Sequence, residues 1–165
     1  MKSIYTLIVF LTLGLVDLAR GFSGHVLDAA NAVVPGSVPT SPGNTRRKCE
    51  AAVTAEHLLL KQGTDDDEVD ICGASDIPLF HSLDTGAIGE LITVGLLGNA
   101  PETAVLTASD DIVAGEAVFT AAGGAVQDLP TDAATYYQVG YALTAAADGE
   151  EVEVMTHPPI ATVVT

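Results

Sequence analysis

Short apolar runs alternate with clusters of Gly, Asp, Asn and Pro from position 49 to the end of the chain. The runs are rich in Val, Leu, Ile, Thr and Tyr, and the turn-forming clusters recur about every 8–12 residues, which is typical of short antiparallel strands. No longer segment repeats its apolar positions with the period of a helix. The pattern therefore predicts strands at 56–62, 69–72, 78–82, 90–97, 104–107, 117–121, 125–128, 137–143 and 151–156, with the tail 160–165 pairing at an edge.

Three local signals refine this pattern. Gly123-Gly124 separates two of the predicted strands and favours a tight hairpin, because glycine readily adopts the positive φ that such turns need. Asp148-Gly149 precedes residues 151–154, where glutamate and valine alternate and predict one solvent-facing side and one buried side. Ser109-Asp110-Asp111 precedes an apolar pair and predicts a single capped helical turn. We identify no internal repeat in the sequence.

Many short strands in about 115 residues predict an all-β fold. We expect a small β-barrel or β-sandwich of short antiparallel strands, preceded by an extended N-terminal arm. Composition sets the domain boundaries: an apolar segment at 1–24, a linker rich in Pro, Gly and Ser with a basic end at 25–49, and the β domain at 50–165.

The first segment begins with Lys2 and an apolar run from Ile4 to Val16, followed by small residues. A basic start, an apolar run of this length, and Ala19 and Gly21 at the positions of a cleavage site are typical of a secretory signal peptide. The run is shorter than the roughly 20 residues that a membrane-spanning helix needs. The alternative is a retained apolar arm that is buried against a partner.

The formal net charge is −16, and it is unevenly distributed. All six Lys and Arg residues lie in the first 61 positions, whereas residues 62–165 hold 18 of the 22 acidic residues. Because such a surface repels phosphate backbones and anionic lipid headgroups, we expect neither nucleic acid nor a membrane as partner. The basic triplet Arg46-Arg47-Lys48 is interpreted either as a solvated linker end or as an anchor for an acidic partner surface.

The residues that carry chemistry do not form a catalytic or ligand-binding motif. The stretch 21–25 departs from the nucleophile-elbow pattern because His25 replaces its last glycine, and the sequence contains no glycine-rich phosphate loop. The four histidines are isolated, and Cys49 and Cys72 are expected to be buried thiols unless secretion permits a disulfide. The acidic run 65–70 departs from the calcium-loop pattern and is predicted to be a solvated turn. We expect no enzymatic activity, no cofactor and no metal.

A series of strand-and-turn phrases occurs in a fixed order along the β domain. The phrases lie at 51–53, 57–65, 72–79, 94–98, 114–118, 120–124, 139–147 and 148–154. In this order they resemble the capsid decoration, or cement, proteins of tailed bacteriophages. The resemblance implies a β domain on the outer surface of a virion capsid, a homo-oligomer with a trimer favoured, and no catalytic residues.

This resemblance and the charge distribution together define the function that we expect. The chain is expected to be a structural virion protein that binds the major capsid protein and stabilises the shell. Capsid-binding residues are predicted in the apolar arm and the basic triplet: Ile4, Leu7, Phe10, Leu11, Arg46, Arg47 and Lys48. The alternative is a secreted or periplasmic β-domain binding protein with a cleaved signal peptide.

Overall fold

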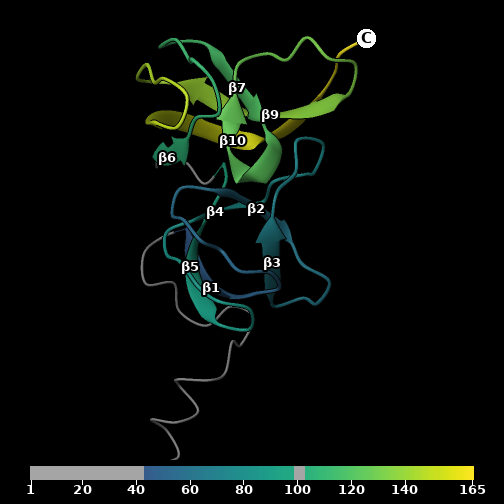
Figure 1. Ribbon diagram of the computed structural model, residues 1–165, viewed down its shortest axis with the longest axis vertical. Helices are drawn as coiled ribbons and strands as arrows, with labels where there is room; N and C mark the ends of the chain where they lie inside the picture. Colours follow the sequence, from purple (N-terminus) through teal and green to yellow (C-terminus); the bar gives the residue numbers. More distant parts are fainter. Residues whose placement is uncertain (1–42, 99–102) are drawn as a thin grey trace, which may run out of the picture. The chain divides into compact units, whose positions relative to one another are not determined.

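The computed structural model describes residues 43–98 and 103–165, and all of these residues belong to one compact unit. The described chain is all-β, as predicted, and its strands form two groups (Figure 1). The first group consists of β1 (Asn44–Cys49), β2 (Leu59–Gln62), β3 (Glu68–Ile71), β4 (Phe80–Ser82) and β5 (Leu91–Leu96). The second group consists of β6 (Thr103–Thr107), β7 (Ala117–Thr120), β8 (Val126–Gln127), β9 (Thr135–Ala142) and β10 (Glu151–Val163).

The first group of strands is a closed barrel with the order β1-β3-β2-β4-β5. Its neighbouring strands are antiparallel except β1 and β3, which are parallel and pair Cys49 with Val69. β1 and β5 close the barrel, with Asn44 opposite Gly95 at one end. The predicted small β-barrel is therefore confirmed, with one parallel pair among the antiparallel ones.

The second group of strands is a curled sheet with the order β6-β10-β9-β7-β8. Its two edge strands approach each other at one point, where an isolated parallel bridge joins Ala108 to Val126. At the same point the Ser109 N–H donates to the Val126 carbonyl at 2.7 Å. The sheet is therefore a barrel that is only partly closed between β6 and β8. A 3-10 turn at Ala122–Gly124 joins β7 to β8 and forms the predicted hairpin.

The long strand β10 shows how the alternation in the sequence determines burial. Val152 and Val154 are fully buried whereas Glu151 is exposed, as predicted. Farther along β10, Ile160 pairs with Gln138 of β9, so the tail pairs as expected. The two prolines of β10 lie in the register shift between its paired segments, where a residue without an N–H removes no ladder hydrogen bond.

The buried apolar residues form two clusters. One cluster fills the first barrel and consists of Cys49, Val53, Leu60, Val69, Phe80, Ile92 and Val94. The other cluster fills the second sheet, and it includes Leu59 and Cys72 from the first half of the described chain. Because these two side chains belong to the core of the second sheet, the barrel and the sheet pack directly against each other.

The structure corrects the sequence analysis in two places. Residues 44–49 form β1 and belong to the barrel rather than to the linker, and they lack the apolar alternation that marks the other strands. Residues 109–111 do not form a helical turn, since Ile112 pairs with Ala146 in an isolated bridge. The Asp110 carboxylate accepts a hydrogen bond from the Asp128 N–H at 3.2 Å instead of capping a helix.

The two groups of strands share one topology, so the described chain contains an internal repeat that the sequence analysis missed. In order, β1 to β5 correspond to β6 to β10. Corresponding register pairs are Ser82↔Val94 and Ala142↔Val154, His81↔Gly95 and Tyr141↔Met155, and Cys49↔Val69 and Ala108↔Val126. The repeat includes the parallel contact, which distinguishes it from a chance likeness between two antiparallel sheets.

A turn before the last strand of each group supports this correspondence. The Gly89 N–H donates to the Cys49 carbonyl at 2.8 Å, and the Gly149 N–H donates to the Ala108 carbonyl at 2.9 Å. In both turns the glutamate that follows the glycine accepts a hydrogen bond from the N–H three residues before it. Both glycines have positive φ, a conformation that other residues adopt at a cost.

Candidate functional site

The predicted capsid-binding residues fall into two groups. Ile4, Leu7, Phe10 and Leu11 lie outside the described residues. The basic triplet 46–48 lies in β1, between β5 and β3 of the first barrel. Arg46 is exposed, and its Nη2 atom donates to the Leu91 carbonyl at 3.4 Å.

Internal contacts engage the other two cations of the triplet. The Arg47 guanidinium lies over the Phe80 ring, 5.4 Å from its centroid, and its Nη1 atom donates to the Asp66 carbonyl at 3.4 Å. The Lys48 ammonium pairs with the Glu68 carboxylate, and this hydrogen bond raises the pKa of Lys48. Arg46 is therefore the member of the triplet whose charge is most available to a partner.

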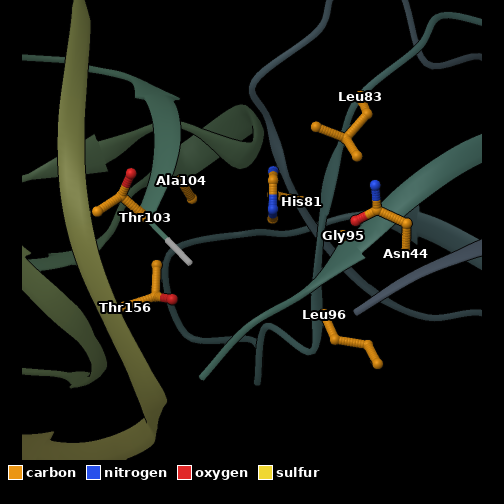
Figure 2. Close-up of a pocket in the computed structure, with 8 residues that line it drawn as sticks. All are labelled: Asn44, His81, Leu83, Gly95, Leu96, Thr103, Ala104 and Thr156. Atoms are coloured by element: carbon orange, nitrogen blue, oxygen red, sulfur yellow. The ribbon is translucent and has the colours of Figure 1, made fainter. Parts of the chain in front are cut away.

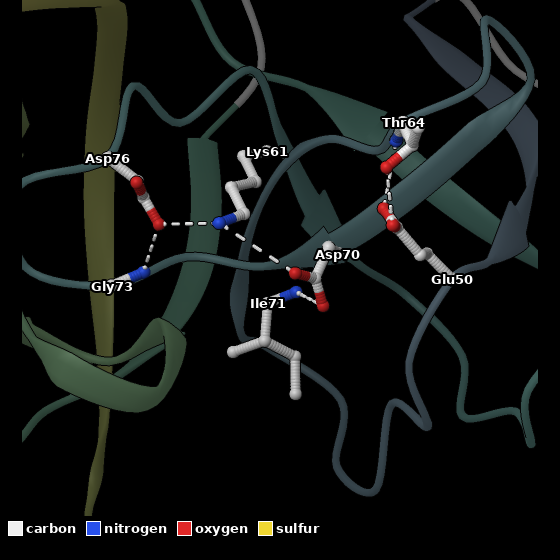
Figure 3. Close-up of polar contacts among 7 residues, drawn as sticks. All are labelled: Glu50, Lys61, Thr64, Asp70, Ile71, Gly73 and Asp76. Atoms are coloured by element: carbon white, nitrogen blue, oxygen red, sulfur yellow. Dashed lines mark hydrogen bonds and ion pairs between the residues drawn. The ribbon is translucent and has the colours of Figure 1, made fainter.

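Lys61 forms a second cationic centre, between two carboxylates (Figure 3). Its Nζ atom lies 2.8 Å from Asp76 Oδ2 and 3.7 Å from Asp70 Oδ2. The hydrogen bond from Lys61 and a second one from the Gly73 N–H lower the pKa of Asp76. This network links β2 and β3 to the loop before β4, so its role is structural.

The prediction of a solvated turn at 65–70 is confirmed only for its first part, since Glu68 and Asp70 lie in β3 and pair with Lys48 and Lys61. Asp65 and Asp66 are exposed, whereas Val69 is fully buried and Ile71 packs against the core of the barrel. Within residues 43–98 and 103–165, no three His, Cys, Asp or Glu side chains gather closely enough to hold a metal ion. The same residues contain no helix long and apolar enough to cross a membrane.

Both cysteines are buried free thiols, as expected. Cys49 lies in the core of the first barrel and Cys72 in the core of the second sheet. Burial raises the pKa of Cys72 to about 12, so its thiol stays protonated and is a poor nucleophile at neutral pH.

A cavity of about 110 Å³ lies where the first barrel meets the second sheet (Figure 2). It is lined by Asn44, His81, Leu83, Gly95, Leu96, Thr103, Ala104 and Thr156. Figure 2 shows His81 among residues of the barrel, with Thr103 and Thr156 on strands of the sheet. Apart from the histidine, the polar side chains of the cavity are one amide and two hydroxyls, which do not ionise near neutral pH.

His81 is the titratable residue of this cavity. Its side chain is nine-tenths buried, and its Nδ1 atom has no hydrogen-bond partner. Burial, together with the nearby His57, lowers the pKa of His81 to about 4, so the imidazole is neutral at pH 7. A neutral imidazole beside hydroxyl and amide groups suits water or a small neutral solute.

Three exposed apolar side chains on the second sheet were not singled out from the sequence. Tyr141 and Met155 lie opposite each other on β9 and β10, and Leu143 directly follows the end of β9, where its N–H donates to the Glu153 carbonyl at 2.7 Å. The signal for this surface is the apolar spacing of Tyr141 and Leu143 on either side of the buried Ala142 in the sequence.

The comparisons with known proteins give likenesses in structure. No model of a known protein family matches the sequence, and no curated protein matches it. The structure is similar to the head fiber gp8.5 N base of bacteriophage phi29, with a TM-score of 0.54 and 22% sequence identity. The match covers 71% of this chain and 96% of the phage protein's chain. The two proteins therefore share a fold.

Proposed function

We propose that the chain is a structural protein of a tailed-bacteriophage virion, and specifically a decoration protein that binds the outer capsid surface and stabilises the shell. The observation that carries this proposal is the fold shared with the phi29 head fiber base over 96% of that protein's chain. The order of strand-and-turn phrases along residues 51–154 supports the same class of protein.

The charge distribution supports a position on the outside of a particle. Residues 103–165 contain no Lys or Arg, and in the first barrel Lys48 and Lys61 are paired with carboxylates. The remaining acidic groups give the β domain an outer surface that repels other particles and nucleic acid. Such repulsion keeps particles that carry many copies dispersed.

In this proposal the major capsid protein is the partner, and the chain works without catalysis, cofactor or metal. Its anchor is the apolar arm with Ile4, Leu7, Phe10 and Leu11, aided by the basic triplet, in which Arg46 has the most available charge. A homo-oligomer, with a trimer favoured, would multiply weak anchors on the shell through avidity.

Localisation in purified particles tests the proposal. Antibodies against the β domain should label the outside of the heads of purified virions, and mass spectrometry should find the chain in the same fraction. A chain that is absent from particles and is recovered from the medium or periplasm, with its N-terminus near residue 22, would contradict the proposal. That result would favour the secreted alternative.

A further inference from the structure

The internal repeat allows two equivalent surfaces to be compared. In the first barrel, four hydrogen-bonded strands present one row of cross-strand partners, called here the first row: Asn44, Gly95, His81 and Leu59. The corresponding strands of the second sheet present the second row: Thr103, Met155, Tyr141 and Ala117. The two rows occupy the same place in the two copies of the fold.

The first row is covered by the second sheet. Leu59 is fully buried in the core of that sheet, and His81 is only 9% exposed. A Cβ atom on Gly124, in the turn between β7 and β8, would lie 2.8 Å from the Leu59 carbonyl oxygen. The Gly124 N–H also donates to the Cys72 carbonyl at 2.8 Å. At this position, the first repeat therefore packs against the second repeat of the same chain.

The second row is open in the described structure. Tyr141 is 44% exposed and Met155 is 52% exposed. Leu143, which is 46% exposed, extends the same surface, whereas its counterpart Leu83 lines the cavity against the second sheet. A single exposed apolar residue is ordinary, but a cross-strand apolar pair with a third apolar residue at the end of β9 indicates an interaction surface.

We propose that Tyr141, Leu143 and Met155 form a docking surface for a protein partner with an apolar centre surrounded by Lys or Arg. The acidic residues around the surface set this chemistry. Glu153 lies on the same side of β10 two positions before Met155, and Glu116 is exposed beside the second row. Complementary charge around an apolar centre orients a partner and speeds its association.

A second copy of the chain does not fit this surface. The first row packs against the partly closed side of the second sheet, where Leu59 and Cys72 belong to the core of that sheet. The corresponding side of the first barrel is closed by register pairs between β1 and β3, and Arg47 covers Phe80 there. A second copy would also bring a net charge of −16 toward an acidic sheet. The partner is therefore a different protein.

The inference rests on the proposed function, because the partner chosen for the test is the major capsid protein. Virus particles that lack the chain are the probe, and co-sedimentation with purified full-length protein measures the affinity. Met155→Glu and Leu143→Glu place an acid within the docking surface. Ile88→Glu is the matched control, since Ile88 is 73% exposed in a turn of the first barrel.

We expect Met155→Glu and Leu143→Glu to weaken binding at least about tenfold, because the new carboxylate loses its hydration against an apolar centre. Ile88→Glu should bind like the wild type, and unchanged melting temperatures should show that all three variants are folded. Raised salt should weaken wild-type binding, since a Lys- or Arg-bearing partner is attracted through screened charges.

Three other outcomes would overturn the inference in different ways. Equal binding by Met155→Glu and Ile88→Glu would refute the docking surface and leave the proposed function intact. A wild-type chain that does not bind particles would contradict the proposed function as well. If ultracentrifugation shows a wild-type oligomer that Met155→Glu dissociates, then the occupant is a second copy and the proposed partner is wrong.

Discussion

Gly95 and His81 face each other across β5 and β4, and a Cβ atom at position 95 would lie 2.2 Å from His81 Nε2. The imidazole ring of His81 therefore occupies the space that a side chain at position 95 would need. Gly95 does not have positive φ, so the requirement for glycine here is steric. The counterpart pair in the repeat, Tyr141 and Met155, has no such restriction, because Met155 is 52% exposed and Tyr141 is 44% exposed beside the ring of His157.

Gly95→Ala should destabilise the protein by about 1–3 kcal/mol, the usual cost of forcing extra volume into a packed site. In a His81→Ala background the same substitution should cost much less, because the ring that opposes the new methyl group is gone. Urea unfolding of the wild type, both single variants and the double variant gives the coupling energy. An equal cost of Gly95→Ala in both backgrounds would show that His81 is not the opposing group.

The lowered pKa of His81 makes stability depend on pH. The unfolded chain takes up the proton near the ordinary value of 6.5, whereas the folded protein takes it up only near pH 4. The folded state therefore binds fewer protons between these values, and stability falls as the pH is lowered from 6.5 to 4. Above pH 6.5 this residue contributes no pH dependence. The full loss is on the order of 3 kcal/mol.

A His81→Gln variant isolates this effect from the titration of the carboxylates. Its unfolding free energy should fall less than that of the wild type between pH 7 and pH 4, although both chains carry the same acidic residues. Urea titrations at several pH values measure the difference. His57 lies near His81 and lowers the pKa of His81 further. In a His57→Gln variant, the pKa of His81 should therefore be slightly higher, and the stability loss should begin at a slightly higher pH. Parallel pH profiles for the wild type and His81→Gln would contradict the assignment.

Lys61→Met should weaken the contact between β2, β3 and the loop before β4. The substitution removes the partner of Asp76 and Asp70 while keeping the aliphatic stem, and a partly exposed network of this kind is worth about 1 kcal/mol. The control is Arg46→Met, which removes an exposed cation with one long contact and should change stability little. Chemical unfolding at low and high salt should show a smaller penalty at high salt, because ions screen the pairs.

Neutralising the acidic turn should have little effect on stability. Asp66→Asn with Asp67→Asn removes two charges from a solvated turn, and exposed charges of this kind are typically worth under about 1 kcal/mol. The backbone contacts of the turn remain, since Asp67 receives the Lys48 N–H through its carbonyl. Thermal unfolding of the double variant with and without calcium is the measurement. A calcium-dependent rise in the wild-type melting temperature that the variant lacks would reveal a metal site.

The sequence predicts the strands in which apolar residues alternate with polar ones, because such alternation indicates one buried face. Val152 and Val154 alternate with glutamates, and the structure buries the valines as expected. β1 escaped prediction because its barrel contacts are made by the backbone and by long cationic side chains such as Arg47. β1 pairs with β3 and β5, and its own residues do not show the apolar alternation that predicts a strand.

The internal repeat and the exposed residues of the proposed docking surface could not be predicted from the sequence, for a related reason. Backbone register sets the topology of a barrel, and many different side chains are compatible with the same register. Position 95 is a glycine packed against the His81 ring, whereas its counterpart in the repeat is the exposed Met155. Tyr141 resembles a core residue when it is read along β9. Only the three-dimensional arrangement shows that Tyr141 is 44% exposed and is covered in part by the edge-on ring of His157, with 6.0 Å between the ring centroids.

The last prediction concerns the apolar arm. Burying the large side chains of residues 4–16 offers on the order of 1.5–3 kcal/mol each, against an ordering cost of about 1–2 kcal/mol of backbone entropy per residue. The balance is favourable only where a partner encloses most of the run. Deleting residues 1–24 should therefore leave a folded β domain, because the described strands pair among themselves, and should remove most binding to particles.

The control for this deletion replaces Ile4, Leu7, Phe10 and Leu11 by Ser at full length, which keeps the reach of the chain. Unchanged urea unfolding with lost co-sedimentation in both variants would support the arm as anchor. If the truncated domain decorates particles as tightly as the full chain, the arm is not the anchor, and the signal-peptide interpretation of residues 1–24 is favoured.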